Sequence, residues 1–351
     1  MKISIGSKIF DGPWGGGNLF VINLKNYLID KGHEVIHDLS SDDIDLILMT
    51  QPLKKSESAS YSISDIIKYV KYVNNNCLVL HRINECDERK DTNYVNESII
   101  DASKYADGRI FVSQWIKNLY ENIGMNMDNS HVILSGSNKT VFNSKNRSIK
   151  EPDEAYRFVT HHWGNNWNKG FDNYQQLDQL VADESFKYDI EFTYIGNLPK
   201  NFEFQNSNHI QPLHGENLAK EIKKNHIYIT GSINEPSGNH HIEGAMCGLP
   251  ILYINSGGIP EYCDGYGVVF EQDNFKEKLI EIIERYDFYN KEILTYENNS
   301  ISMSEKYEEL FKDMFNNKKK FIDNRDLDKK NSPFNFIKKY TFLIKRKIKL
   351  I

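Results

Sequence analysis

The sequence predicts an α/β protein built from two doubly wound domains with parallel sheets. Three observations support this fold class: a length of 351 residues, a hydrophobic content of 39% that includes many aromatic residues, and short apolar runs that alternate with helical patterns. The length allows two domains of ordinary size, each with its own core. Strands that alternate with helices are typical of parallel sheets whose faces are covered by those helices.

The first domain is expected to cover residues 1–150. Its expected strands are, in order, KISIG, HEVIHD, IDLILMT, CLVLHRIN, GRIFVS and HVILSG. The segments between them with helical periodicity are NLFVINLKNYLIDKG, ISDIIKYVKYVNNN and SIIDASKYAD. The polar stretch NSKNRSIKEPDEAYR that follows is typical of a linker between domains.

The second domain is expected over residues 151–300, where the alternation restarts. Its expected strands are RFVTHHW, YDIEFTYIG, NHIQPL, HIYITGS and PILYIN, and FKEKLIEIIERY is expected to be a helix. A helix over residues 301–317 is expected to cross back to the first domain. Residues 318–351 are expected to form a tail rich in basic and aromatic residues.

Charge and cysteine content exclude several classes of protein. The formal net charge is −6, and residues 318–351 hold 12 Lys and Arg against 3 Asp, so the rest of the chain is strongly acidic. An acidic body argues against a nucleic-acid binder. The four cysteines form no Cys-x-x-Cys pair, which suits a reducing compartment. The N-terminus opens directly into an apolar strand and no run of 18 apolar residues occurs, so we expect a cytoplasmic protein that is neither secreted nor membrane-spanning.

The most informative segment is HIYITGSINEPSGNHHIEGAMCGLPILYIN, whose pattern predicts strand, loop, helix and strand. Glu235 then lies in the loop and Glu243 about one turn into the helix, both at the edge of the sheet where α/β proteins bind ligands. The backbone amides at the helix start, near Gly238, are suited to an anion. A phosphate there would leave both carboxylates free to accept hydrogen bonds from sugar hydroxyls, which predicts a nucleotide-sugar ligand.

The run EPSGNHHIEGAMCGLPILYINSGGIPEY resembles the Glu-x7-Glu signature of the retaining glycosyltransferases of family 4. The resemblance implies the GT-B fold, in which two Rossmann-like domains face each other across a cleft. It also implies that Glu235 contacts the donor sugar, that Glu243 holds the ribose, and that Gly238, Asn239 and His240 belong to the donor site.

The glycine-rich segment GPWGGGNLFV follows the first expected strand and opens the first expected helix. Glycines there let the backbone approach a ligand closely. By the resemblance, Gly15, Gly16 and Asn18 face the diphosphate and the donor. The segment also partly matches a dinucleotide fingerprint, with Asp38 as the acid near the second strand, so a nucleotide-dependent oxidoreductase is an alternative hypothesis.

Lys169 matches the family's lysine that neutralises the leaving diphosphate, a role suited to a point charge on a long stem. The family's arginine about six residues earlier is replaced here by Trp163, next to His161 and His162. Either a histidine supplies the missing positive charge or the diphosphate is held more weakly. The departure motivates a second alternative: a catalytically weak or inactive paralogue that acts as a nucleotide-binding or scaffold protein.

The segment CLVLHRINECDERK is expected to place His81 and Arg82 just past a strand, as candidate contacts of the acceptor or the diphosphate. In the alternative interpretation, Arg82 pairs with Asp87 or Glu88 and His81 caps the strand. Both interpretations remain open from the sequence.

No cofactor and no metal are expected, because the nucleotide sugar is a substrate. The pair Asp43-x-Asp45 superficially matches a metal-binding Asp-x-Asp motif, but it precedes an apolar strand and so lies at that strand's amino end. The histidine pair at residues 161 and 162 and the pair at 240 and 241 are expected to pack or to face solvent.

The function implied by the resemblance is a retaining hexosyltransferase that moves a sugar from a nucleotide-sugar donor to a hydroxyl of a glycan or glycolipid, in surface polysaccharide or lipopolysaccharide synthesis. Residues 332–351 interleave apolar and basic side chains, which suits a helix on the cytoplasmic face of an anionic membrane. The alternative is that the aromatic residues of this tail pack on the first domain.

Overall fold

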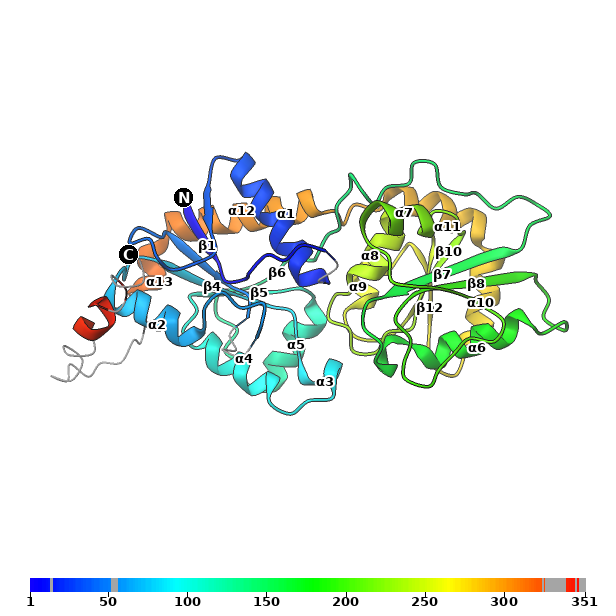
Figure 1. Cartoon of the computed structure of the whole chain (residues 1–351), viewed down its shortest axis with the longest axis horizontal. Coiled ribbons are helices and arrows are strands. Elements are labelled where there is room, and N and C mark those ends of the chain that lie inside the picture. The colour runs from blue at the N-terminus through cyan, green and yellow to red at the C-terminus, as the bar shows by residue number, and fades with distance from the viewer. Residues whose placement is uncertain (13–14, 52–55, 324, 326–338, 345, 347–351) are drawn as a thin grey trace.

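The computed structural model describes residues 1–12, 15–51, 56–323, 325, 339–344 and 346. Two α/β domains lie side by side, and each is built on a sheet of six strands (Figure 1). Every strand pair in both sheets is parallel. The predicted α/β class with two parallel sheets is therefore confirmed.

The first sheet has the strand order β2-β1-β3-β4-β5-β6. Its strands are β1 (Lys2–Ile5), β2 (Glu34–Ile36), β3 (Leu46–Met49), β4 (Leu78–Ile83), β5 (Gly108–Phe111) and β6 (Ser130–Val132). All residues of the central strands β3 and β4 are buried. Helices cover both faces of such a sheet, which explains why these strands are continuous apolar runs rather than alternating ones.

Five helices connect the strands of the first domain. They are α1 (Gly16–Asp30), α2 (Ile63–Tyr72), α3 (Asp87–Lys90), α4 (Val95–Ser103) and α5 (Gln114–Asn122). The short helix α3 lies on the side of this domain that faces the second domain (Figure 1).

The second sheet has the strand order β12-β11-β10-β7-β8-β9. Its strands are β7 (Tyr156–His162), β8 (Ile190–Gly196), β9 (Asn208–Ile210), β10 (Ile227–Thr230), β11 (Ile251–Ile254) and β12 (Gly267–Phe270). The connecting elements are η1 (Trp167–Lys169), α6 (Phe171–Val181), α7 (Gly215–Ile222), α8 (Asn239–Met246), α9 (Ile259–Cys263), α10 (Phe275–Glu284), α11 (Tyr286–Glu292) and η2 (Ile293–Thr295). The core of this domain is rich in aromatic side chains, which are packed among aliphatic ones.

The chain returns to the first domain after the second sheet is complete. Helix α12 (Ser300–Asn316) packs against α1, and the rings of Phe20 and Tyr307 lie 5.3 Å apart. Its apolar face belongs to the same core as β1 and β3. The next helix, α13 (Lys318–Ile322), lies at the far end of the first domain from the second domain (Figure 1).

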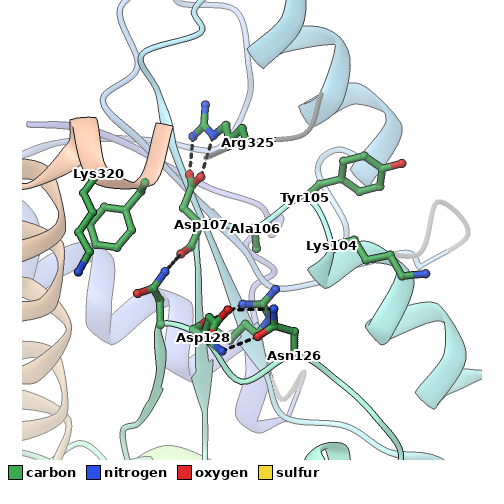
Figure 2. Close-up of a pocket in the computed structure, with 11 residues that line it drawn as sticks. Lys104, Tyr105, Ala106, Asp107, Asn126, Asp128, Lys320 and Arg325 are labelled. Carbon is green, nitrogen blue, oxygen red and sulfur yellow. Dashed lines mark hydrogen bonds and ion pairs between the residues drawn. The ribbon is translucent and has the colours of Figure 1, made fainter. Parts of the chain in front are cut away.

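Arg325 ties the chain beyond α13 to the first sheet (Figure 2). Its Nε donates to Asp107 Oδ1 at 2.7 Å, and its Nη2 donates to Oδ2 of the same carboxylate. Both side chains are buried, with exposed fractions of 8% and 2%. Asp107 also accepts a hydrogen bond from the backbone N–H of Val79 at 2.7 Å. This bidentate pair lies beside a pocket of about 250 Å³ whose lining includes Lys320.

Residues 332–351, the part of the predicted tail expected to bind a membrane, lie mostly outside the described residues. Of the part that is described, the ring of Phe342 lies 5.9 Å from that of Tyr72, and Arg346 Nη2 lies 2.7 Å from Asp42 Oδ1. These contacts place that part of the tail against the first domain. Within the described part of the chain, no helix has the length and apolar character needed to cross a membrane.

Candidate active site

The loop between β10 and α8 carries Glu235 into a buried position between the two domains. Its side chain is 6% exposed. Lys169 Nζ donates to Oε2 at 2.6 Å, and Arg89 Nε lies 3.0 Å from Oε1. Burial alone would raise the pKa of the Glu235 carboxyl, but the charges of Arg89 and Lys169 outweigh burial and hold this pKa well below its ordinary value. Glu235 is therefore an ionised carboxylate between two cations.

The backbone around Glu235 is held by specific contacts. The N–H of Gly258 donates to the carbonyl of Glu235 at 2.9 Å, and the N–H of Asn234 donates to Ser256 Oγ at 2.9 Å. Gly238 has a φ of 64°, and a Cβ at this position would lie 2.8 Å from His240 Cε1. Only glycine fits there without strain, so the loop's path into α8 depends on this residue.

Glu243 lies within α8, as the sequence predicted, and its side chain is 5% exposed. Its Oε2 accepts a hydrogen bond from His161 Nε2 at 2.9 Å, and His161 Nδ1 lies 3.0 Å from the hydroxyl of Tyr228. A neutral imidazole with its hydrogen on Nε2 satisfies both bonds, because Tyr228 then donates to Nδ1. His161 thus orients Glu243 from the end of β7.

Three further histidines near this carboxylate pair are buried and neutral. Burial lowers the pKa values of His162 and His240 well below the ordinary value, and it lowers the pKa of His241 to about 3. His162 Nε2 lies 2.7 Å from the Tyr174 hydroxyl, and His240 Nε2 hydrogen bonds to a threonine of β10. His162 is therefore unsuited to replace the charge of the family's arginine. Trp163, the next residue, is 53% exposed.

The glycine-rich turn of the first domain meets the start of α8. Gly15 is the N-cap of α1, and a Cβ at Gly16 would lie 2.9 Å from the Asn239 side chain. The two helix N-termini therefore face each other across the domain boundary. The Asn18 side chain donates to the carbonyl of Phe10 at 2.8 Å and accepts from the Phe10 N–H at 3.1 Å. Asn18 thus shapes the turn before α1.

His81 and Arg82 lie inside β4, which corrects the prediction that they follow the strand. His81 Nδ1 lies 2.7 Å from Ser103 Oγ on α4, and burial lowers the pKa of His81 to about 3. The guanidinium of Arg82 stacks 3.9 Å from the ring centroid of Phe20. Among the described residues, Arg82 forms no ion pair with an acidic side chain of α3, so the alternative pairing is also wrong.

Sequence reasoning missed two groups that join the domains. The first is Arg89, described above, which α3 of the first domain presents to Glu235. The second is Glu261 of α9, whose carboxylate accepts hydrogen bonds from the N–H groups of Gln114 and Trp115 at 2.6 and 2.7 Å. It caps the N-terminus of α5 in the other domain, where a negative charge is favourable. In the sequence, the PEY segment contains Glu261 and the charged DERK segment contains Arg89. Neither segment shows which residue of the other domain its side chain contacts.

The Asp43-x-Asp45 pair has structural partners at the amino end of β3. Lys2 Nζ lies 2.7 Å from Asp43 Oδ1, and the Lys2 N–H donates to Asp45 Oδ2 at 2.8 Å. Parallel strands place this end opposite to the ligand-binding edge. Across the described ranges, no cluster of three or more His, Cys, Asp or Glu side chains suited to a metal ion is found.

Comparison with known families gives a match in the second domain. Residues 200–293 match the family described as glycosyl transferases group 1. The matched segment contains Glu235 and Glu243 and ends well after the Gly-Gly-Ile-Pro-Glu turn, whereas Lys169 lies before it. No curated protein sequence matches the chain.

Solved structures with low sequence identity share the fold over nearly the whole chain. The sucrose-phosphate synthase of Thermosynechococcus elongatus is 12% identical, with a TM-score of 0.62 over 90% of this chain and 99% of that one. HepE of Anabaena in complex with UDP-glucose is 11% identical, with a TM-score of 0.65 over 89% of this chain and 100% of that one. The catalytic domain of starch synthase IV from Arabidopsis thaliana, bound to ADP and acarbose, is 12% identical, with a TM-score of 0.64 over 90% of this chain and 99% of that one. At such identities the likeness shows the fold alone, and it confirms the predicted GT-B fold.

Proposed function

We propose that the chain is a retaining glycosyltransferase of family 4 that moves a hexose from a nucleotide-sugar donor to a hydroxyl of a glycan or glycolipid acceptor. The observation that carries this proposal is the pair of buried carboxylates beside the start of α8, with Glu235 bonded to Lys169 and Glu243 bonded to His161. The match of residues 200–293 to the group 1 family supports it. The UDP-glucose in the HepE complex supports a nucleotide-sugar donor.

The donor would lie between the two facing helix N-termini. The partial positive charges at the starts of α1 and α8 favour a diphosphate at the backbone amides near Gly16 and Gly238. Glu243 would then accept hydrogen bonds from the ribose hydroxyls. The hydrogen bond from His161 would hold the Glu243 side chain in the rotamer that this contact needs. Glu235 would accept hydrogen bonds from the hexose hydroxyls.

Retention needs no protein nucleophile in this proposal. The bond between the anomeric carbon and the diphosphate oxygen breaks, and a bond to the acceptor oxygen forms on the same face of the sugar. The acceptor's proton passes to the departing diphosphate oxygen. Lys169 and the amides near Gly16 and Gly238 would stabilise the charge that develops on the diphosphate, while the two domains hold donor and acceptor together.

Contacts across the domain boundary support a closed arrangement that keeps water out. The Glu261 carboxylate caps α5, and the amide of Asn234 donates to the carbonyl of Glu88 at 3.2 Å. Ser237 Oγ donates to Ser135 Oγ at 3.1 Å. Water competes with the acceptor, so closure would suppress donor hydrolysis.

Thermal unfolding with UDP, GDP, ADP and NAD, followed by a turnover assay with the matching glucose nucleotides, tests the proposal. A ligand that binds the folded state raises its stability by RT ln(1 + [L]/Kd), so the correct nucleoside diphosphate raises the melting temperature. NMR of the product must show the anomeric configuration of the donor. Stabilisation by NAD alone would instead favour the oxidoreductase hypothesis. That hypothesis is weakened because the Asp38 carboxylate already accepts two hydrogen bonds from Ser40.

The inactive-paralogue hypothesis rests on Trp163, since none of the three buried neutral histidines replaces the family's arginine charge. It predicts nucleotide binding without turnover, so the same two assays separate it from the enzyme.

The proposed setting is the cytoplasm, at the membrane face where a lipid-linked acceptor for a surface polysaccharide or lipopolysaccharide is presented. Flotation with neutral and anionic liposomes tests that setting.

A further inference from the structure

We propose that Arg89 is a positioning residue that takes over the charge of Glu235 when the domains close, so that Lys169 is released to the leaving diphosphate. This inference rests on the proposed function and adds a role for the first domain in the donor site. Arg89 contacts Oε1 of Glu235, whereas Lys169 contacts Oε2, so both cations can be bound at once. The carboxylate is therefore balanced even after one of them leaves.

The position of Arg89 is fixed by its surroundings. The Asp87 carboxylate, at the start of α3, accepts hydrogen bonds from the N–H groups of Val95 and Asn96 at 2.9 Å each and so caps α4. The Tyr120 hydroxyl, from α5, donates to the carbonyl of Glu85 at 2.9 Å. Two neighbouring helices thus lock α3 against the first domain. The Arg89 side chain is 27% exposed.

Glu85 orients the guanidinium itself. Arg89 Nη1 donates to Glu85 Oε2 at 2.9 Å, which leaves Nε directed at Glu235. A guanidinium can hold two carboxylates through separate N–H groups, whereas a single ammonium cannot do so with the same geometry. Lys90 Nζ lies 2.5 Å from the same Glu85 oxygen, but the Lys90 side chain is 52% exposed, so this contact contributes little.

Charge balance explains why a second cation is needed. In the proposed reaction Lys169 must turn from Glu235 to the diphosphate. Without Arg89, this movement would leave a 6% exposed carboxylate with no cation among the described residues, and an unpaired buried charge is strongly unfavourable. The buried histidines cannot help, because burial keeps His162, His240 and His241 neutral.

The location of Arg89 links this balance to domain closure. Arg89 belongs to the first domain and Glu235 to the second, so their contact exists only when the domains meet. Lys169 and Glu235 both belong to the second domain and remain paired when it is alone. The diphosphate would thus gain its lysine only in the closed state, where water is excluded and the acceptor is in place.

The experiment compares Arg89→Ala and Arg89→Lys with the control Lys90→Ala. The control removes a neighbouring cation that contacts Glu85 but not Glu235. Donor consumption is measured with whichever of UDP-, GDP- and ADP-glucose the wild type uses. Arg89→Ala should lower kcat about 10- to 100-fold with little change in donor KM, because charge release fails after binding. Arg89→Lys should recover part of the loss, and Lys90→Ala should match the wild type. Far-UV circular dichroism checks that each variant is folded.

The pH profile and a double-mutant cycle separate this role from a merely structural one. The pKa of Glu235 should rise when Arg89 is removed, so the acid limb of the kcat/KM profile should move to higher pH in Arg89→Ala and not in Lys90→Ala. In a Lys169→Ala background, Arg89→Ala should have little further effect on the kcat of the folded protein, because there is no lysine left to release, although the double variant should be less stable because Glu235 then has no cation. Additive effects of the two substitutions, or an unmoved acid limb, would overturn the inference.

The outcomes also separate the inference from the proposed function. A wild-type protein that consumes none of the three donors would overturn both. An active wild type together with an Arg89→Ala variant that is equally active would overturn the inference alone.

Discussion

The substitution Lys169→Ala tests the candidate active site most directly. Lys169 Nζ lies 2.6 Å from Glu235 Oε2, and its side chain is 12% exposed, so the ammonium is already placed in a largely water-excluded site. Loss of one preorganised group that stabilises developing charge costs about 10²- to 10³-fold in kcat, or about 2.7–4 kcal/mol. We expect a loss of this size, because no other lysine or arginine of the second domain contacts Glu235 among the described residues.

The fold should survive this substitution, because Arg89 still balances the Glu235 carboxylate in the variant. The assay measures nucleoside diphosphate released per enzyme in the presence and absence of acceptor, with urea unfolding as the check on stability. Lys224→Ala is a matched control: Lys224 also forms a 2.6 Å pair with a glutamate, Glu221, but its side chain is 66% exposed, and exposed pairs contribute little. A folded Lys169→Ala variant with turnover within about threefold of the wild type would refute the assigned role.

Four further predictions follow from the same structure. Glu243→Ala should strongly reduce transfer and abolish the thermal stabilisation by the correct nucleoside diphosphate, because the ribose loses its acceptor; unchanged stabilisation would contradict the ribose role. Transfer should survive EDTA, because the carboxylates serve hydroxyl groups; activity that is lost and then restored by Mn²⁺ would show that the donor site is misassigned. Arg325→Ala should lower the free energy of unfolding of the first domain by about 3–5 kcal/mol in urea titrations, because it leaves Asp107 buried without its cation; a loss no larger than that of Lys104→Ala, whose side chain is 65% exposed, would count against the pair. Removal of residues 332–351 should abolish flotation with anionic liposomes, and binding that ignores salt or lipid charge would rule out the membrane surface.

The strands of both sheets were largely predictable, because strands buried on both faces are short apolar runs. The run LILM of β3 and the run IYIT of β10 are fully buried and stand out from their polar surroundings. Strand β12, GVVF, was missed. It begins with a glycine and holds only three apolar residues, so its apolar signal is weaker than that of the neighbouring strand β11, ILYI.

The candidate site was predictable where its parts share one local motif. Glu235 and Glu243 are eight residues apart, and the helix between them places both at the same edge of the sheet. Arg89 was not predictable in this way. It lies in a short charged segment whose composition suggests a solvated surface, and its contact with Glu235 exists only through the packing of one domain against the other. The neutral state of His162 was equally hidden, because it depends on the burial of the end of β7 against α6 rather than on the neighbouring sequence.

The paired charges around Glu235 bear on how the cleft can bind a charged donor. Lys169 and Arg89 both contact Glu235, so none of the three is an unpaired charge in this buried place. When the domains close on a donor, Lys169 would turn from Glu235 to the diphosphate, while Arg89 and the hexose hydroxyls remain as partners of Glu235. A free hexose offers hydroxyls but no anion for the lysine, and inorganic phosphate offers an anion but no hydroxyls for the carboxylate. With inorganic phosphate alone, Glu235 keeps the charge of Arg89 but loses a hydrogen-bond donor, and with a free hexose alone, Lys169 gains no anion. The arrangement therefore favours a ligand that carries an anion and sugar hydroxyls on one molecule, as a nucleotide sugar does.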